Sequence, residues 1–141
     1  MYTHAVKTMS SPIKLREIFE TAAAVRQEFE TTTYDRDRLK KLYLAYDPKV
    51  VTPEHGIDDF IDGAEKTFPK GSCGLASLYL QDRLGVGEVI TGTYTGKLHT
   101  FLALPKIIIA RKKLIIVDTT ADQFEGGPSV YVGPLVYPWS C

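Results

Sequence analysis

The 141-residue sequence lacks several features that mark particular classes of protein. It has only two cysteines, Cys73 and Cys141, so no disulfide framework is expected, and the protein either works in a reducing compartment or is delivered from one. Its seventeen basic and seventeen acidic residues balance, which leaves no overall field to attract nucleic acid or an anionic membrane. The most apolar stretch, KIIIARKKLIIV, is interrupted by three charges, so neither a secretory signal nor a spanning helix is predicted.

Metal and cofactor signatures are also missing. No cluster of His, Cys, Asp and Glu has the spacing of metal ligands, and the pair Gly85 and Gly87 lacks the strand context and further glycine of a dinucleotide loop. We therefore expect no metal and no cofactor. The sequence has no internal repeat, low-complexity tract or linker, so a single domain over residues 1–141 is expected, long enough to bury a core without disulfides.

The sequence changes from helical to strand character at about residue 85. Apolar periodicity, caps and breakers predict four helices, over residues 11–30 (with Ser11 as N-cap), 35–46, 56–68 and 72–84. Alternating or continuously apolar segments predict strands within residues 88–95, 98–104, 106–110, 114–118 and 129–139. A mainly helical part over residues 1–70 would then precede a helix and an antiparallel sheet over residues 71–141. This order indicates an α+β fold.

One cysteine stands between a glycine-rich turn and an apolar run, in the stretch PKGSCGLASLYL. Cys73 falls at the expected start of a helix, where free backbone N–H groups and the helix dipole stabilise a thiolate. Gly71 and Gly74 would let a substrate backbone come close. On its own such a cysteine is more often a buried small residue than a nucleophile. Whether Cys73 is a nucleophile therefore depends on which residues the fold places beside it.

Two later residues supply what a thiol nucleophile needs, a base and a group that orients the base. In LHTFLAL the alternation puts His99 and Phe101 on one face of a strand, and Asp118 ends the apolar strand LIIVD. If the two strands are neighbours, imidazole and carboxylate meet, and a helix packed on the sheet points Cys73 at the ring. A structural histidine and a turn-forming aspartate are the alternatives. The combination of three matched groups favours a Cys-His-Asp triad.

These three segments resemble a known superfamily. GSCGLAS, LHTFLAL and LIIVDTTADQF are similar to the Cys, His and Asp segments of papain-like and transglutaminase-like cysteine enzymes. The resemblance spans residues 71–124, and the pattern H-x-aromatic followed by a strand ending in D-x-T is most similar to the transglutaminase-like branch. It implies a papain/transglutaminase-like core, in which the nucleophile opens a helix packed on the antiparallel sheet that bears the base and its partner.

The resemblance also implies roles for individual residues. Cys73 would be the nucleophile, His99 the general base and acid, and Asp118 the orienting residue. Phe101 stands where transglutaminases commonly have Trp and is expected to wall the substrate site. Many papain-like enzymes have a Gln shortly before the cysteine to complete the oxyanion hole, but AEKTFPKGS contains none. The Cys73 backbone N–H would supply one donor, and the second donor is not identified.

The other residues expected at the substrate site flank this triad. Gly71, Ser72 and Gly74 surround the nucleophile. Gln123, in TTADQF, either lines the cleft, where its amide can donate to an oxyanion, or belongs to a plain turn.

The superfamily implies attack of a thiolate on a carbonyl carbon, with a peptide or glutamine-type amide as the expected substrate. Hydrolysis or deamidation is the leading reaction. A transglutaminase or acyltransferase with the same triad, and a non-catalytic binding module that keeps the fold, are the alternatives. The expected partner is a protein or peptide, with no nucleic acid and no membrane, and no oligomeric state is predicted. By analogy, we expect a bacterial enzyme or toxin/effector domain, in the cytoplasm or delivered into a target cell's cytosol.

Overall fold

The structure is a computed structural model of the chain and describes residues 13–47, 56–105 and 114–141. Within these residues, four helices precede five strands. The helices are α2 (Leu15–Glu30), α3 (Arg36–Tyr46), α4 (Ile57–Thr67) and α5 (Cys73–Leu84). The strands are β1 (Glu88–Tyr94), β2 (Lys97–Leu104), β3 (Ile115–Asp118), β4 (Tyr131–Pro134) and β5 (Trp139–Ser140), and a short 3-10 helix, η2 (Ala121–Gln123), follows β3. The predicted α+β order is confirmed.

Helix α2 shows how the apolar periodicity is used. The spacing in the sequence predicts five inward positions, Ile13, Ile18, Ala22, Val25 and Phe29. The last four are buried, whereas Ile13 precedes the helix and is partly buried. Its start differs from the prediction, because α2 begins at Leu15, where the Glu17 side chain accepts a hydrogen bond from the Lys14 backbone N–H at 3.3 Å. Ser11, the predicted N-cap, lies outside the described residues. None of the helices in the described ranges is both long and apolar enough to cross a membrane.

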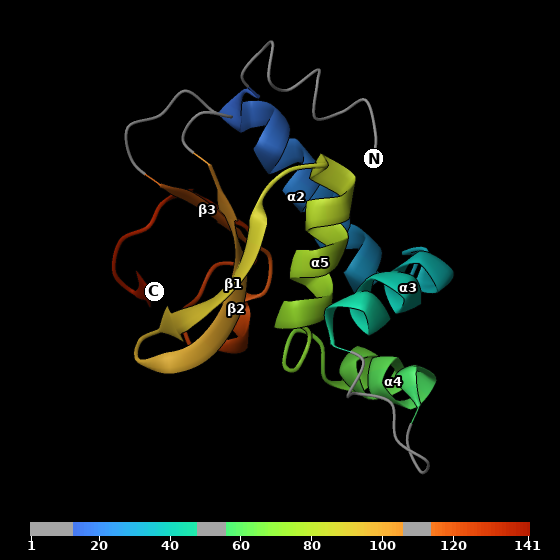
Figure 1. The fold of residues 1–141 in the computed structure, drawn as a ribbon. Coiled ribbons are helices and arrows are strands. Elements are labelled where there is room, and N and C mark those ends of the chain that lie inside the picture. Colours follow the sequence, from blue (N-terminus) through green and yellow to red (C-terminus); the bar gives the residue numbers. More distant parts are fainter. Residues whose placement is uncertain (1–12, 48–55, 106–113) are drawn as a thin grey trace.

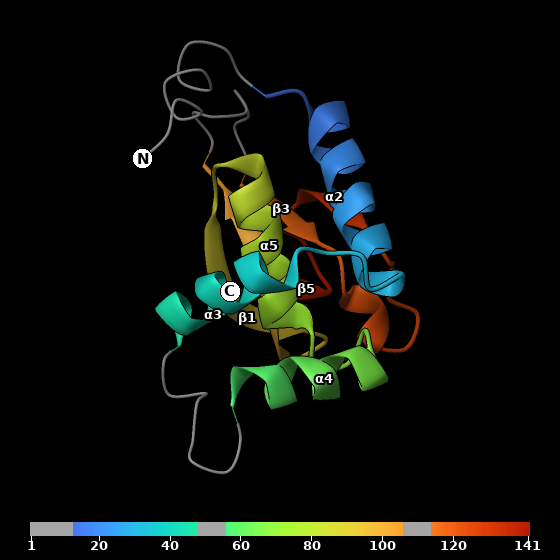
Figure 2. The ribbon, with the colours of Figure 1, turned by 90° about the vertical axis from the view of Figure 1, so that its right-hand side faces the viewer.

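Helix α5 is the central helix of the molecule. It starts at Cys73, as the glycine-rich turn predicts, and ends at Gly85, whose φ of 76° lies in the left-handed region that favours glycine. Its buried residues cover almost every side of it and are Leu75, Ala76, Ser77, Leu78, Tyr79 and Leu80. It packs on β1 and β2 on one side and on α2 and α3 on the other (Figure 1). Figure 2 shows α3 and α4 running across α5 rather than along it.

The sheet is antiparallel and strongly curved, with the strand order β4-β3-β2-β1-β5 (Figure 1). The long β1–β2 ladder pairs Gly92 with His99, whereas the β2–β3 ladder pairs only residues 102–104 of β2. The part of β2 that carries His99 therefore has no β3 partner beside it. The predicted strand over residues 106–110 and the turn at residues 111–113 lie outside the described residues.

Two apolar cores lie on the two faces of the sheet. Leu102 and Leu104 of β2 point into the larger core, which the helices complete. Phe101 and Ala103 point into a smaller core on the other face, together with Tyr94, Ile116, Ala121 and Trp139. The period-2 alternation predicted for β2 is thus confirmed. His99 belongs to the face of Phe101.

Candidate active site

A hydrogen bond between β2 and β3 is the centre of the candidate site. His99 Nε2 lies 2.7 Å from Asp118 Oδ2, and both side chains are at most 1% exposed. Their strands are neighbours in the sheet, and β3 ends at Asp118, beyond the last β2–β3 pair. The sequence predicted this meeting from two segments nineteen residues apart.

The Asp118 carboxylate is held by donors from three segments. Trp139 Nε1 donates to Oδ2 at 2.8 Å, while the Thr120 backbone N–H and hydroxyl donate to Oδ1 at 2.9 and 3.4 Å. A carboxylate that accepts this many hydrogen bonds is fixed in one orientation. Because Nε2 of His99 is the fourth donor, the imidazole is fixed with it.

Aromatic rings surround the imidazole. Phe124 meets it edge-on with ring centroids 5.1 Å apart, Tyr94 does the same at 6.2 Å, and Phe101 is tilted at 6.1 Å. The other ring nitrogen, Nδ1, is buried and has no nitrogen or oxygen partner among the described residues. Nδ1 is therefore the atom of His99 that is available to the thiol of Cys73.

Cys73 occupies the first position of α5, at the open edge of β2. The Ser72 side chain does not cap the helix, so the first N–H groups of α5 are not satisfied by an adjacent side chain. The helix dipole and these free N–H groups favour a negative charge here. Cys73 is partly buried and free, and it interacts with both His99 and Thr100.

The charges of Cys73 and His99 are coupled. Burial opposes ionisation of the thiol, but the neighbouring His99 and Thr100 outweigh it and lower the pKa of Cys73. Burial likewise opposes protonation of the imidazole, but Asp118 and then Cys73 outweigh it and raise the pKa of His99 to about 9. Both shifts favour the thiolate–imidazolium pair over the neutral pair.

Three residues predicted at the substrate site, Gly71, Ser72 and Gly74, flank Cys73 in the sequence. Gly71 is exposed, with a φ of +80°, and leaves the turn before α5 open. Ser72 is buried, and its hydroxyl donates to the Ala64 carbonyl of α4 at 3.4 Å, so it ties the turn to α4 rather than facing solvent. At Gly74, a methyl group would lie 3.5 Å from the ring of Tyr43, so the space beside this glycine is bounded by an aromatic side chain.

Two further predicted residues lie on the sheet side of the site. Phe101 is fully buried, which differs from the expectation that it walls the substrate site, because η2 and β5 close the smaller core over it. Its ring supports His99 from inside. Gln123 lies in η2, one residue before Phe124, and its Oε1 is buried without a partner in the part of the chain that the structure describes.

The site also contains residues that sequence reasoning missed. Thr100 lies beside the thiol of Cys73. The signal in the sequence for this proximity is its position next to His99 in the strand. Trp139 reaches Asp118 because β5 pairs with β1, a pairing that no local pattern indicates. Tyr43 approaches from α3, whose sequence carries no sign of proximity to Cys73.

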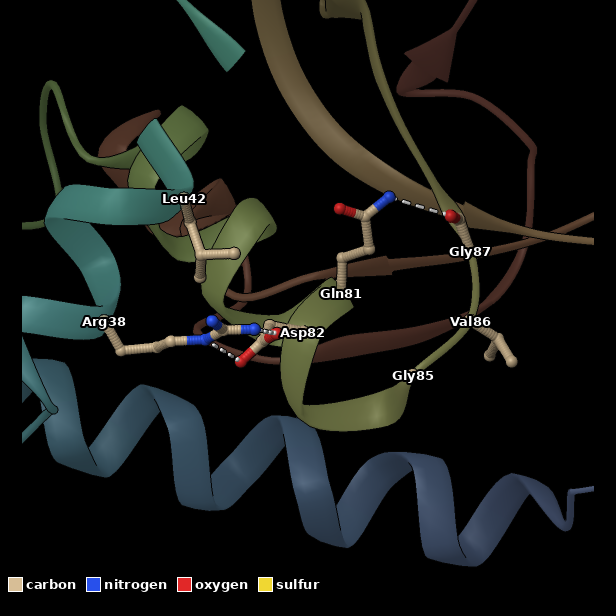
Figure 3. A pocket seen from close by; sticks show the side chains of 7 residues that line it. All are labelled: Arg38, Leu42, Gln81, Asp82, Gly85, Val86 and Gly87. Atoms are coloured by element: carbon tan, nitrogen blue, oxygen red, sulfur yellow. Dashed lines mark hydrogen bonds and ion pairs between the residues drawn. The ribbon is translucent and has the colours of Figure 1, made fainter. Parts of the chain in front are cut away.

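A separate hollow of about 490 Å³ lies at the opposite end of α5 (Figure 3). It is lined by Arg38, Leu42, Gln81, Asp82, Gly85, Val86 and Gly87. Within it Arg38 pairs with Asp82, and Gln81 donates to the Gly87 carbonyl at 2.9 Å. At 1.5 Å per residue, Gln81 is roughly 12 Å along the helix from Cys73. This hollow is not part of the candidate site.

Comparisons with protein-family models, with curated proteins and with solved structures find no match to this chain. Among the described residues, no group of three or more His, Cys, Asp or Glu side chains is placed to hold a metal ion.

Proposed function

We propose that this protein is a thiol-dependent enzyme with a papain/transglutaminase-like core, in which Cys73 attacks the carbonyl of a peptide or glutamine-type amide. The observation that carries the proposal is the buried His99 ring, which is hydrogen-bonded to Asp118 through Nε2 and coupled to Cys73. A buried, hydrogen-bonded imidazole with a raised pKa beside a thiol with a lowered pKa is a typical arrangement for nucleophilic catalysis.

In the proposed reaction, the Cys73 thiolate forms a bond to the carbonyl carbon, and the carbonyl π electrons move to oxygen. The tetrahedral intermediate collapses as the carbon–nitrogen bond breaks, and the leaving amine takes a proton from His99. The neutral imidazole then removes a proton from water, which attacks the thioester and releases the acid and the thiolate. Asp118 keeps the ring oriented throughout.

Hydrolysis or deamidation is the proposed outcome because water is the simplest acceptor. An amine acceptor would turn the same intermediate into transamidation or acyl transfer. The substrate is proposed to be a protein or peptide. We place the protein in the cytoplasm or, as an effector, in a target cell's cytosol, where Cys73 and Cys141 remain the free thiols that they are here.

Iodoacetamide labelling across pH tests the proposed nucleophile. Cys141 is a free and exposed thiol, so it serves as an internal reference. We expect Cys73 to be alkylated well below an ordinary thiol pKa of about 8.5, with the difference lost in His99→Ala. Mass spectrometry of the two peptides gives the rates. Labelling of Cys73 no faster than of Cys141 near neutral pH would contradict the proposal.

The two pKa shifts set the direction of the pH profiles. Above the lowered pKa of Cys73 the thiolate is present and alkylation reaches a plateau. Amide cleavage also needs the proton of His99, so its rate rises with the thiolate and falls again as pH passes about 9. Release of ammonia from glutamine peptides, or of amines from a peptide library, measures this second profile. Two profiles of the same shape would contradict the role of His99 as proton donor.

A further inference from the structure

Tyr43 of α3 lies against the first turn of α5. A methyl group on Gly74 would be 3.5 Å from Tyr43 Cε1 and 3.9 Å from its hydroxyl oxygen. Burial, Asp47 and Tyr46 raise the pKa of Tyr43, and Cys73 adds to the effect, so the hydroxyl is within electrostatic reach of the thiol. Tyr43 is thus beside the nucleophile, although α3 and α5 are far apart in the sequence.

The hydroxyl of Tyr43 is a donor without an acceptor among the residues that the structure describes. It makes no hydrogen bond with any residue in the described ranges, although the hydroxyls of Tyr34, Tyr79 and Tyr131 all do. The side chain is only partly buried, so a bound substrate can reach it. A tyrosine O–H is a suitable donor to the oxygen of a tetrahedral intermediate.

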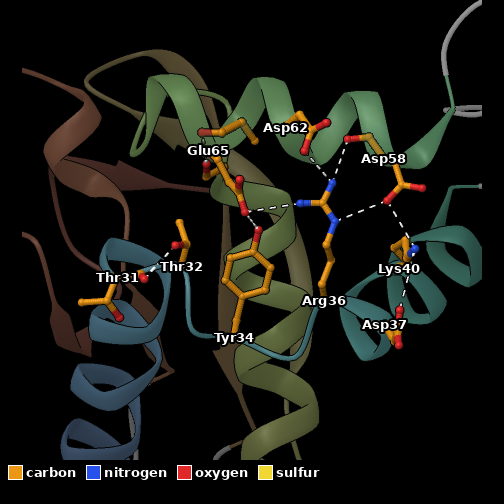
Figure 4. Close-up of polar contacts among 11 residues, drawn as sticks. Thr31, Thr32, Tyr34, Arg36, Asp37, Lys40, Asp58, Asp62 and Glu65 are labelled. Atoms are coloured by element: carbon orange, nitrogen blue, oxygen red, sulfur yellow. Dashed lines mark hydrogen bonds and ion pairs between the residues drawn. The ribbon is translucent and has the colours of Figure 1, made fainter.

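Contacts with α4 and α5 fix the position of Tyr43. Its ring packs on Phe60 of α4, with centroids 5.0 Å apart, and on the bare backbone of Gly74. Helix α3 is joined to α4 by Arg36, which contacts Asp58, Asp62 and Glu65 (Figure 4). Arg38 joins the same helix to Asp82 of α5. A donor that is held before the substrate arrives needs no reorganisation during the reaction.

We infer that the Tyr43 hydroxyl and the Cys73 backbone N–H together form the oxyanion hole of this enzyme, an inference that rests on the proposed function. As the sulfur–carbon bond forms, the carbonyl oxygen becomes an anion and accepts hydrogen bonds from both groups. Tyr43 keeps its proton, and collapse of the intermediate restores the carbonyl. The hydroxyl takes the place of the glutamine that is missing before Cys73.

Comparing two reactions of Cys73 tests this inference. Acylation by p-nitrophenyl acetate passes through an oxyanion, whereas alkylation by iodoacetamide displaces iodide and forms none. We use the full chain with Cys141→Ser, and compare Tyr43→Phe with Tyr46→Phe, which alters a more exposed tyrosine of the same helix. Cys73→Ala provides the blank. Tyr43→Phe should slow acylation by about tenfold to a hundredfold and leave alkylation unchanged, whereas Tyr46→Phe should change neither.

Each result separates the inference from the proposed function. Selective loss of acylation in Tyr43→Phe supports the oxyanion role. Acylation at the rate of the unsubstituted protein, or an equal loss of acylation and alkylation, overturns it while leaving Cys73 as the nucleophile. If the unsubstituted Cys73 is itself alkylated and acylated no faster than a free thiol, the proposed function fails, and the inference fails with it.

Discussion

At the scale of single residues, the site depends on one carboxylate. Asp118 Oδ2 accepts from both His99 and Trp139, while Oδ1 accepts from Thr120. Burial alone would keep the imidazole neutral, and the contact with Asp118 reverses that tendency. Asp118 therefore affects the charge state of the Cys73 thiol indirectly, through the His99 ring.

Replacing Asp118 with Asn tests this dependence. The amide keeps the size of the side chain and removes its charge, so the pKa of His99 should fall below about 9. A neutral imidazole no longer stabilises the thiolate, so the pKa of Cys73 should rise, and alkylation near neutral pH should slow by about tenfold for each unit of that rise. Titration of the His99 ring by NMR and iodoacetamide labelling measure the two effects.

Asp37→Asn is the matched control, because this carboxylate is 89% exposed. It removes the same charge from the molecule and should leave both titrations unchanged. An unaltered His99 titration in Asp118→Asn would show that the carboxylate does not set the protonation of the ring.

At the scale of elements, Arg26 connects α2 to the segment that follows β3. Its guanidinium donates to both carboxylate oxygens of Asp122, at 2.6 and 2.7 Å, and to the Thr119 carbonyl at 2.9 Å. It also lies 4.7 Å from the ring centre of Phe68, shortly before Cys73 in the chain. One side chain thus contacts the residues after Asp118 and a residue shortly before Cys73.

We expect Arg26→Met to lower the free energy of unfolding by about 1–3 kcal/mol, because Asp122 and the Thr119 carbonyl lose their donors. It should also raise the pH midpoint of Cys73 alkylation, since the segment carrying Asp118 becomes less fixed. In Arg26→Lys the midpoint should be raised less than in Arg26→Met, because lysine keeps the positive charge but cannot form the bidentate hydrogen bonds of arginine. Urea unfolding and the alkylation profile measure the two quantities.

Arg38→Met provides the comparison for this element. Arg38 also pairs with an aspartate, Asp82, but the pair is exposed and lies at the other end of α5. Arg38→Met should lower the free energy of unfolding much less than Arg26→Met, because solvent screens an exposed ion pair, and it should leave the alkylation midpoint in place. A similar midpoint shift in both variants would mean that Arg26 acts through stability alone.

At the scale of the whole molecule, the site is completed where the curved sheet brings its two edge strands, β4 and β5, near each other. β5 pairs with β1 and brings Trp139 to Asp118 across the smaller core. The close approach is possible because β1 has a glycine at that point. A Cβ atom on Gly92 would lie 2.1 Å from the Ser140 carbonyl oxygen and 3.2 Å from the Phe101 ring.

Gly92→Ala should therefore push β5 away from β1 and lower the free energy of unfolding by about 1–3 kcal/mol through overpacking. Gly63→Ala is the opposite control, because a methyl group there meets nothing within 4 Å and the residue is inside α4. It should raise the free energy by about 0.5–1 kcal/mol. Urea unfolding of both variants gives the comparison. Equal stability of the two proteins would contradict the role assigned to Gly92.

Local patterns predicted the elements well. Periodicity located α3 and α5, and alternation assigned His99 and Phe101 to one face of β2. The contacts that complete the site could not be predicted, because they depend on how distant elements pack. Alternation gives the face of Phe101 but not its depth, which η2 and β5 determine. Tyr43 reaches Gly74 only because α3 crosses α5, and no pattern within α3 specifies that crossing.

Trp139 is the only tryptophan in the sequence. Its indole N–H is bonded to the carboxylate that orients His99, and its ring stacks on Tyr131 at 3.9 Å. Light absorbed selectively by tryptophan therefore excites a single fluorophore, and its emission comes from a side chain that contacts Asp118. The molecule carries its own optical probe, so a change at Asp118, whether from pH, acylation or loss of β5, can be followed in real time without a label.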